Sequence, residues 1–329
     1  MARFVVYLAV GLTLVLPVWA SGPGAYLVSS RVSQDPAQLW EYDLYLVEGT
    51  RRRQLTDLAG PEGEPAVHAR SGRFAFVAAP RGRFQVLTSS FGSSTVRKHG
   101  AGFDHCGHPS FDPEGRRLVY PADPGDGRFV LVIEDLETGG QERLTTGPGN
   151  SLNPEWSPDG RFIVFVSDDP GEAESGWRGR PLLRPGQVLA PLPGSRRPQT
   201  WLYRHDLRTG QTTRLTRGEG ADRDPAFSPD GASLAFSRRL GTWEAHVMVM
   251  DFADGRIRPL TDEANLNLQP AFSPDGRGLY FTSSRSGGFK IWFKDLVGGS
   301  LTRLTEGTPS EQRACPVASA HRQDTRGTE

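Results

Sequence analysis

The stretch "NPEWSPDGRFIVF", residues 153–165, decides the fold because it combines a tight turn with a strand pattern. In Ser-Pro-Asp-Gly (157–160), proline fixes φ at the second turn position, aspartate suits the third, and glycine accepts a positive φ. The residues that follow, "FIVFVS", form a short apolar segment rich in β-branched and aromatic side chains. The stretch therefore predicts a β-hairpin.

The same pattern recurs along the chain. Its prolines are spaced by 44, 45, 71 and 45 residues, and a Leu-Thr pair begins ten residues before four of them. A fixed period of this size indicates a repeat architecture. The other copies are "EPAVHARSGRFAF" (64–76), "HPSFDPEGRRLVY" (108–120), "DPAFSPDGASLAF" (224–236) and "QPAFSPDGRGLYF" (269–281).

Each repeat supplies four short strands. Two flank the turn, a third follows in segments such as "TWLYRHDL" (200–207), and a fourth ends in Leu-Thr. Four antiparallel strands per unit of about 44 residues are typical of a β-propeller blade. We expect an all-β, six-bladed β-propeller over residues 21–320; five blades with loose ends is the alternative.

The first blade lacks its proline-containing strand. The segment "EQRACPVASA" (311–320) offers Pro316, twelve residues after Leu304. We expect this segment to complete the first blade and to close the ring, which would leave no exposed strand edge. A closed ring needs no partner to cover an edge, so a monomer is expected.

Three segments depart from the repeat. Residues 1–20 combine Arg3, an apolar run of about a dozen residues and Ala20, the pattern of a cleaved secretory signal. An uncleaved anchor is the alternative, although the run is short for a membrane helix. The long spacing places an inserted loop at about 170–197, and residues 321–329 are expected to form a flexible tail. The mature chain should be periplasmic or secreted, with no membrane span.

At the phrases "WSPDG" and "FSPDG", each followed by an apolar strand and later by "RLT", the chain resembles the TolB-type propeller family. The resemblance covers residues from about 25 to 320. It implies a propeller that works in the cell envelope and binds an envelope protein, for example a peptidoglycan-associated lipoprotein. The α/β domain that precedes the propeller in that family is expected to be absent. The same blades also accompany peptidases of the prolyl oligopeptidase class.

Composition and motifs exclude several functions. The 38 basic and 38 acidic residues cancel, which argues against nucleic-acid binding. The sequence contains no Gly-x-Ser-x-Gly elbow and no His-Glu-x-x-His. His105, Cys106 and His108 suggest a metal, but they align with a repeat copy and lack further ligands. We expect no metal, no cofactor and no Cys106–Cys315 disulfide, because the two cysteines belong to blades that are not neighbours.

The residue before each repeat proline is the best pointer to a site. We expect these residues to gather at one mouth of the central channel, together with the loops between second and third strands. Polar channel residues with aromatic and arginine side chains in nearby loops suit a protein or peptide partner. The candidate residues are Glu64, His108, Asn153, Asp224 and Gln269 before the prolines, Glu62, Asp222, Asn267 and Arg313 nearby, and Trp177, Arg178, Arg180 and Trp243 in the loops.

Two functions remain open from the sequence. The favoured one is a non-catalytic scaffold that binds an envelope protein or peptide. The alternative is a lyase or hydrolase at the channel mouth, acting on a sugar or small peptide, with carboxyls such as Glu64 and Asp224 as acid and base. An idle, hydrated channel is the structural alternative to both.

Overall fold

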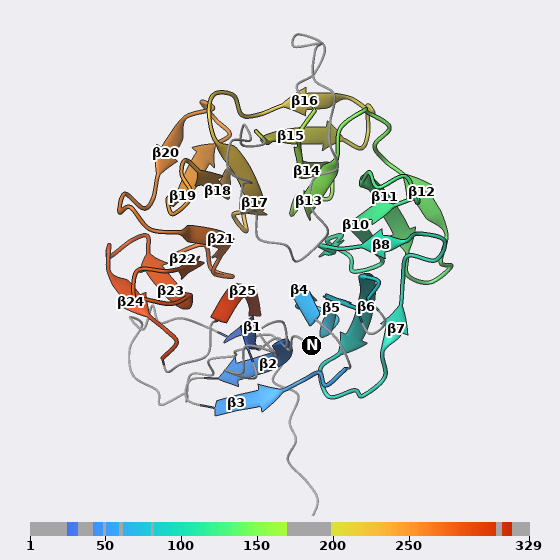
Figure 1. Ribbon diagram of the computed structural model, residues 1–329, viewed down its shortest axis with the longest axis horizontal. Helices are drawn as coiled ribbons and strands as arrows, with labels where there is room; N and C mark the ends of the chain where they lie inside the picture. Colours follow the sequence, from blue (N-terminus) through green and yellow to red (C-terminus); the bar gives the residue numbers. More distant parts are fainter. Residues whose placement is uncertain are drawn as a thin grey trace, which may run out of the picture.

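Six antiparallel sheets are arranged in a ring in the computed structural model (Figure 1). Five of them have four strands, and in one the innermost strand is divided in two. The structure describes residues 25–31, 42–48, 51–58, 62–79, 82–169, 199–306 and 311–317. The predicted signal, the inserted loop with Trp177, Arg178 and Arg180, and the predicted tail lie outside these residues. The described part contains no helix long and apolar enough to cross a membrane.

The first three blades follow one another in chain order, except that the last strand of the chain joins blade 1. Blade 1 contains β25 (Glu311–Val317), β1 (Ala25–Arg31), β2 (Tyr42–Glu48) and β3 (Arg51–Gln54); blade 2 contains β4 (Glu62–His68), β5 (Arg73–Ala78), β6 (Gln85–Ser90) and β7 (Arg97–Lys98); blade 3 contains β8 (His105–Cys106), β9 (Ser110–Phe111), β10 (Arg117–Asp123), β11 (Val130–Asp135) and β12 (Gln141–Arg143).

The remaining blades are regular. Blade 4 contains β13 (Ser151–Trp156), β14 (Phe162–Ser167), β15 (Trp201–Asp206) and β16 (Thr212–Arg214); blade 5 contains β17 (Ala221–Phe227), β18 (Ser233–Arg239), β19 (Ala245–Asp251) and β20 (Ile257–Pro259); blade 6 contains β21 (Asn267–Phe272), β22 (Gly278–Ser283), β23 (Lys290–Asp295) and β24 (Leu301–Arg303).

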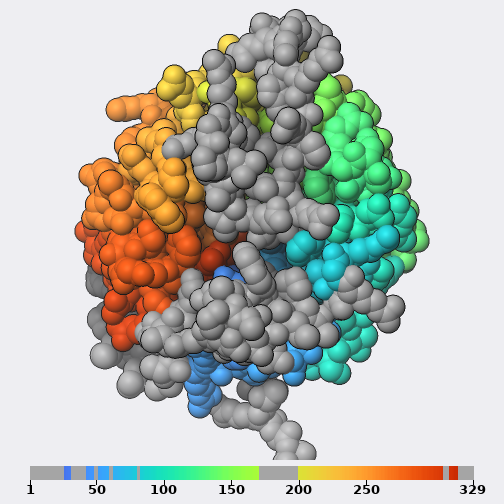
Figure 2. All heavy atoms as spheres, viewed as in Figure 1, coloured from blue at the N-terminus to red at the C-terminus, as the bar shows by residue number. Residues whose placement is uncertain are grey.

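The architecture confirms the expected six-bladed propeller. Neighbouring strands of each blade pair antiparallel, and the innermost strands β4, β13, β17, β21 and β25 lie nearest the centre (Figure 1). The blades follow one another as wedges around the ring (Figure 2). Blade 3 differs because its innermost strand is interrupted around His108 into β8 and β9, both paired with β10.

The ring closes as expected, but in a different register. β25 pairs with β1, with Leu27 opposite Cys315. The alignment on Pro316 was wrong by two residues. Arg313 has the positive φ that the residue before the proline has in every other blade, so Ala314, ten residues after Leu304, takes the place of the proline. The conformation at this position therefore does not require a proline after it.

The apolar core is divided into layers between neighbouring blades. Between blades 1 and 2, for example, Leu27 and Leu44 pack against Phe74 and Phe76, and all four are almost fully buried. Tyr26 of blade 1 packs on Tyr280 of blade 6 in the same way, with ring centroids 5.3 Å apart, so the layer at the closure resembles the others. Burying apolar area between blades is the main force that holds the ring.

The repeated Leu-Thr pair has a specific structural role. In five blades the threonine hydroxyl accepts a hydrogen bond of 2.9–3.0 Å from a backbone N–H of the third strand. This bond fixes the chain where it leaves the fourth strand and begins the crossing to the next blade. The threonines are Thr56, Thr145, Thr216, Thr261 and Thr305.

The Ser-Pro-Asp-Gly turns form as predicted. In blade 4, Gly160 donates its N–H to the Ser157 carbonyl at 2.9 Å, and the Ser157 hydroxyl accepts from the N–H of Phe162 at 2.8 Å. Gly160 and its counterpart Gly231 both have a φ of 71°. The glycine is needed here because most L side chains resist this backbone region.

Replacing Gly160 or Gly231 with valine should therefore destabilise the protein. A β-branched residue held at positive φ costs about 1–3 kcal/mol, and we expect the free energy of unfolding to fall by this amount in urea titrations. Gly288→Val is the matched control, since its backbone is outside the positive-φ region and an added Cβ meets nothing within 4 Å. Equal stability of Gly231→Val and the control would refute the turn assignment.

Candidate functional site

A ring of six polar residues with positive φ lies inside the channel, one from each blade. Their φ values lie between 37° and 57°, and no other non-glycine residue among those described has a positive φ. Five of these residues coincide with shifts in strand register, which is how a β-bulge redirects a side chain. We call them the floor residues: Glu64, His108, Asn153, Asp224, Gln269 and Arg313.

The floor residues contact one another across the channel. Asp224 of blade 5 forms an ion pair with Arg313 of blade 1 and accepts a hydrogen bond of 3.2 Å from Asn153. His108 lies between two carboxylates: Nδ1 is 2.7 Å from Glu64 Oε1, and Nε2 is 3.7 Å from Asp224 Oδ1. Four of the five expected residues thus contact one another together with Arg313, which was expected only nearby, whereas Gln269 accepts a hydrogen bond of 3.0 Å from the Thr282 hydroxyl of its own blade.

Both floor carboxylates are held in the ionised form. Burial by itself would raise the pKa of Asp224, but the charge of Arg313 and the contact with His108 outweigh it and lower the pKa to about 2. Burial likewise opposes ionisation of Glu64, yet the charge and hydrogen bonds of His108 lower its pKa. A general acid at neutral pH needs a raised pKa, so this pair does not suit the acid–base roles of the enzyme alternative.

A cavity of about 690 Å³ extends from the floor to the turns between first and second strands. Its rim includes Pro113, Pro158 and Pro229 of those turns. The floor residues lie near the starts of the innermost strands, and the cavity extends from them toward these turns. The cavity opens on the turn face, whereas the loops between second and third strands, including the one with Trp243, lie at the opposite end of the strands.

Two of the nearby candidates are structural parts of blades 5 and 6. Asp222 is 2% exposed and forms a bidentate ion pair with Arg238, at 2.7 and 2.8 Å. Asn267 is fully buried and accepts a hydrogen bond of 2.8 Å from the Ser283 hydroxyl. Trp243 is 76% exposed in the loop between β18 and β19, away from the cavity.

Glu62, the third nearby candidate, joins blade 2 to the end of blade 1. It is fully buried and accepts hydrogen bonds from the Thr56 hydroxyl and, at 2.7 Å, from the N–H of Leu58. Burial raises its pKa to about 8, against the lowering effect of these hydrogen bonds. Because Glu62 binds the segment that connects blade 1 to blade 2, its role is structural.

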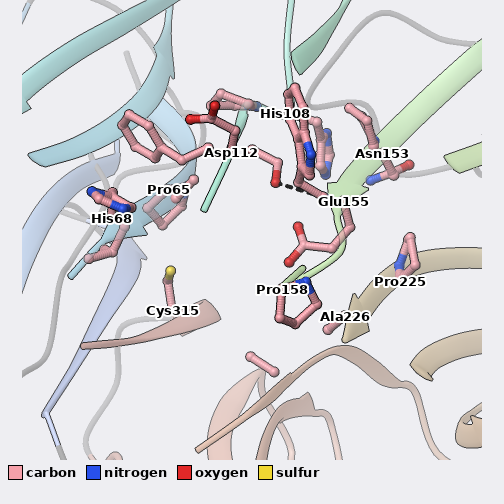
Figure 3. Close-up of a pocket in the computed structure, with 18 of the residues that line it drawn as sticks. Pro65, His68, His108, Asp112, Asn153, Glu155, Pro158, Pro225, Ala226 and Cys315 are labelled. Atoms are coloured by element: carbon pink, nitrogen blue, oxygen red, sulfur yellow. Dashed lines mark hydrogen bonds between the residues drawn. The ribbon is translucent and has the colours of Figure 1, made fainter. Parts of the chain in front are cut away.

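The sequence analysis missed Glu155, which follows Pro154. Its carboxylate points into the cavity, as does the thiol of Cys315 (Figure 3). Burial raises the pKa of Glu155 to about 7, partly opposed by the Ser110 hydroxyl and the charge of Arg313. The aligned repeats did contain a signal, because the other copies have alanine, serine or cysteine at this position.

Cys106 and Cys315 belong to blades 3 and 1 and do not form a disulfide. Both cysteines are free, and burial raises the pKa of each to about 12. Over the ranges that the structure describes, no group of three or more His, Cys, Asp or Glu side chains is arranged to hold a metal ion.

Comparison with known proteins gives a family model and two proteins of similar sequence. The family model of the TolB beta propeller domain matches residues 25–174 and 194–323. An uncharacterized peptidase, YuxL, of Bacillus subtilis is 31% identical over 147 residues, which cover 40% of this chain and 22% of that protein. The Tol-Pal system protein TolB of Francisella tularensis is 28% identical over 135 residues, which cover 40% of this chain and 25% of its own length.

Among solved structures, TolB from Acinetobacter baumannii has a TM-score of 0.70 and 20% identity, covering 89% of this chain and 67% of that one. This similarity concerns the fold. The regions matched by sequence amount to about a quarter of the length of the two curated relatives.

Proposed function

Because this chain belongs to the TolB β-propeller family, we propose that it is a non-catalytic binding scaffold that takes a protein or peptide partner on its turn face. We further propose that it acts in the periplasm or outside the cell, with an envelope protein as partner. A peptidoglycan-associated lipoprotein is the first candidate, in keeping with the Tol-Pal relative.

The observation that carries this proposal is the strained polar floor beneath an open cavity. Six non-glycine residues with positive φ represent a cost of about 1–3 kcal/mol each in unfavourable backbone conformation. Such strain is typical of sites that position side chains for a ligand. A cavity of about 690 Å³ is also within the range of about 300–1,000 Å³ that ligand pockets occupy.

The proposal is tested by filling the cavity. Ala226 of blade 5 lines it, whereas Ala253 lies exposed on an outer turn of the same blade, so Ala226→Trp and Ala253→Trp are matched variants. Each would be used to capture proteins from an envelope extract of the source organism, followed by mass spectrometry. We expect wild type and Ala253→Trp to recover the same partner and Ala226→Trp to recover about tenfold less, equivalent to a loss of about 1.4 kcal/mol.

Thermal unfolding of both variants shows whether the fold is preserved. If Ala226→Trp is folded and recovers the partner as well as wild type does, the cavity is not the binding site. If no protein is recovered specifically, the scaffold proposal fails, and sugars and short peptides would then be screened by thermal shift to examine the enzyme alternative.

A further inference from the structure

The wall of the cavity directly above the floor has one unusual member. Each blade contributes the residue that follows the repeat proline or its Ala314 equivalent. Five of the six side chains are small, whereas Glu155 is long and ionisable (Figure 3). The six wall residues are Ala66, Ser110, Glu155, Ala226, Ala271 and Cys315.

Glu155 is partly buried and is bound by the fold less completely than the floor acids Glu64 and Asp224. Glu64 accepts hydrogen bonds from the backbone N–H of His108 at 2.6 Å and from its ring, and Asp224 pairs with Arg313. Glu155 has the Ser110 hydroxyl and the more distant charge of Arg313. Burying a carboxyl where alanine suffices in three other blades reduces stability, so a role in binding explains it better than a role in folding.

The charge of the cavity favours a cation. Glu64, Asp112, Glu114, Asp224 and an ionised Glu155 give five negative charges in and beside the cavity, against three positive charges on Arg70, Arg223 and Arg313. The sum is negative when the imidazoles of His68 and His108 are neutral. Carboxylates in a concave site of low dielectric attract positively charged groups. The other titratable groups that line the cavity are His68 at the end of β4, Arg70, Asp112 and Glu114 on the turns that follow the innermost strands, and the Cys315 thiol.

The rest of the cavity wall is apolar and can pack against the methylene groups of a long cationic side chain. Pro109, Pro154, Pro225 and Pro270 line the cavity beside the three alanines. Long cationic side chains bind with their methylene groups against apolar surface and their charge on a polar partner.

We propose that the cavity binds one ammonium or guanidinium group of the partner polypeptide, with Glu155 as its counter-ion. The group would be either a lysine or arginine side chain or the amino terminus of the partner. This inference rests on the proposed partner binding and adds the chemistry that the cavity recognises.

The test uses four short glycine peptides and isothermal titration calorimetry with the full chain. Two are blocked at both ends and carry a central lysine or arginine; a third, also blocked, carries norleucine; the fourth has no side chain but a free amino terminus. We expect the side-chain cation or the free amine to bind and norleucine to bind at least tenfold more weakly. Comparing the first two peptides with the fourth distinguishes the two sources of the cation.

Variants of Glu155 make the test specific. Glu155→Gln should weaken binding of the cationic peptide about tenfold or more, Glu155→Asp should retain part of it, and Glu137→Gln on an exposed outer turn should leave it unchanged. Affinity of wild type for a side-chain cation should rise about tenfold from pH 6 to pH 8, because Glu155 loses its proton in this range. The pH dependence should be much smaller in Glu155→Gln, in which His68 and His108 are the imidazoles that still line the cavity.

Equal binding of norleucine, or unchanged affinity in a folded Glu155→Gln, would overturn the inference. So would the absence of any peptide binding at millimolar concentration. Failure of this inference can be distinguished from failure of the scaffold proposal. If Glu155→Gln recovers the protein partner as well as wild type does, and Ala226→Trp does not, then the cavity is the partner site but does not recognise a cation.

Discussion

A chain that ends at Glu306, and therefore lacks β25, is expected to lose its folded monomeric state. β25 is the innermost strand of blade 1 and pairs with β1 along its length. Its removal would leave β1 as an open edge and would uncover the layer between blades 1 and 6, where Ala314 is 2% exposed. It would also take Arg313 away from Asp224.

The expected loss is comparable with the whole stability of a domain, about 5–15 kcal/mol. Size-exclusion chromatography and circular dichroism would show aggregation or an absence of cooperative unfolding, since unpaired strand edges associate. A chain that ends at Val317 keeps β25 and should unfold as the full chain does. A folded monomer from the shorter chain, with a melting temperature within a few degrees of wild type, would mean that the closure does not stabilise the ring.

The closing strand shows how far the sequence predicts this fold. The period and the turn residues identify five blades, because each copy encodes its own hairpin, and the sixth follows from the strands left over at the two ends of the repeat. The register of the last copy was predicted wrongly, since Pro316 resembled the repeat proline while Ala314 had the correct spacing from Leu304. The bulge at Arg313 forms through strand pairing and its position in the ring, so the sequence carries no local signal for it.

The sequence predicted which residues belong to the site better than it predicted how these residues are arranged. The alignment identified the floor residues because each occupies the same place in its copy. It did not predict that Asp224 reaches Arg313, because blades 5 and 1 are not neighbours and their distance depends on the width of the channel. Glu155 was overlooked because the prediction concentrated on the position before the proline.

Glu134 of β11 should give the largest effect of any single substitution considered. It is 4% exposed and joins blade 2 to blade 3: its carboxylate lies 2.7 Å from His99 Nδ1 and accepts hydrogen bonds from the Tyr120 hydroxyl and from the N–H of Gly100. The His99 ring in turn lies 2.9 Å from the hydroxyl of Thr88 on β6. Removing one member leaves the others buried and without their partner.

We expect Glu134→Ala to lower the free energy of unfolding by about 3–5 kcal/mol, the order of the cost of removing one partner of a buried, hydrogen-bonded ionic contact, because the donors of Tyr120 and Gly100 lose their acceptor. Glu134→Gln should cost less, because an amide oxygen can still accept hydrogen bonds. Urea unfolding monitored by tryptophan fluorescence would measure both. The exposed Glu137→Gln in the following turn is the matched control and should change stability by less than about 0.5 kcal/mol.

The same residue predicts a pH dependence with a definite sign. Burial would raise the pKa of Glu134, but the hydrogen bonds from His99, Tyr120 and Gly100 outweigh it and lower the pKa to about 2, from an ordinary value of 4.5. A carboxyl with a lower pKa in the folded state stabilises fully above the unfolded pKa and loses this contribution as the pH falls toward the folded one. The stability gap between wild type and Glu134→Gln should therefore narrow from pH 6 to pH 3, whereas a constant gap would show that packing, and not the charge of Glu134, holds these two blades together.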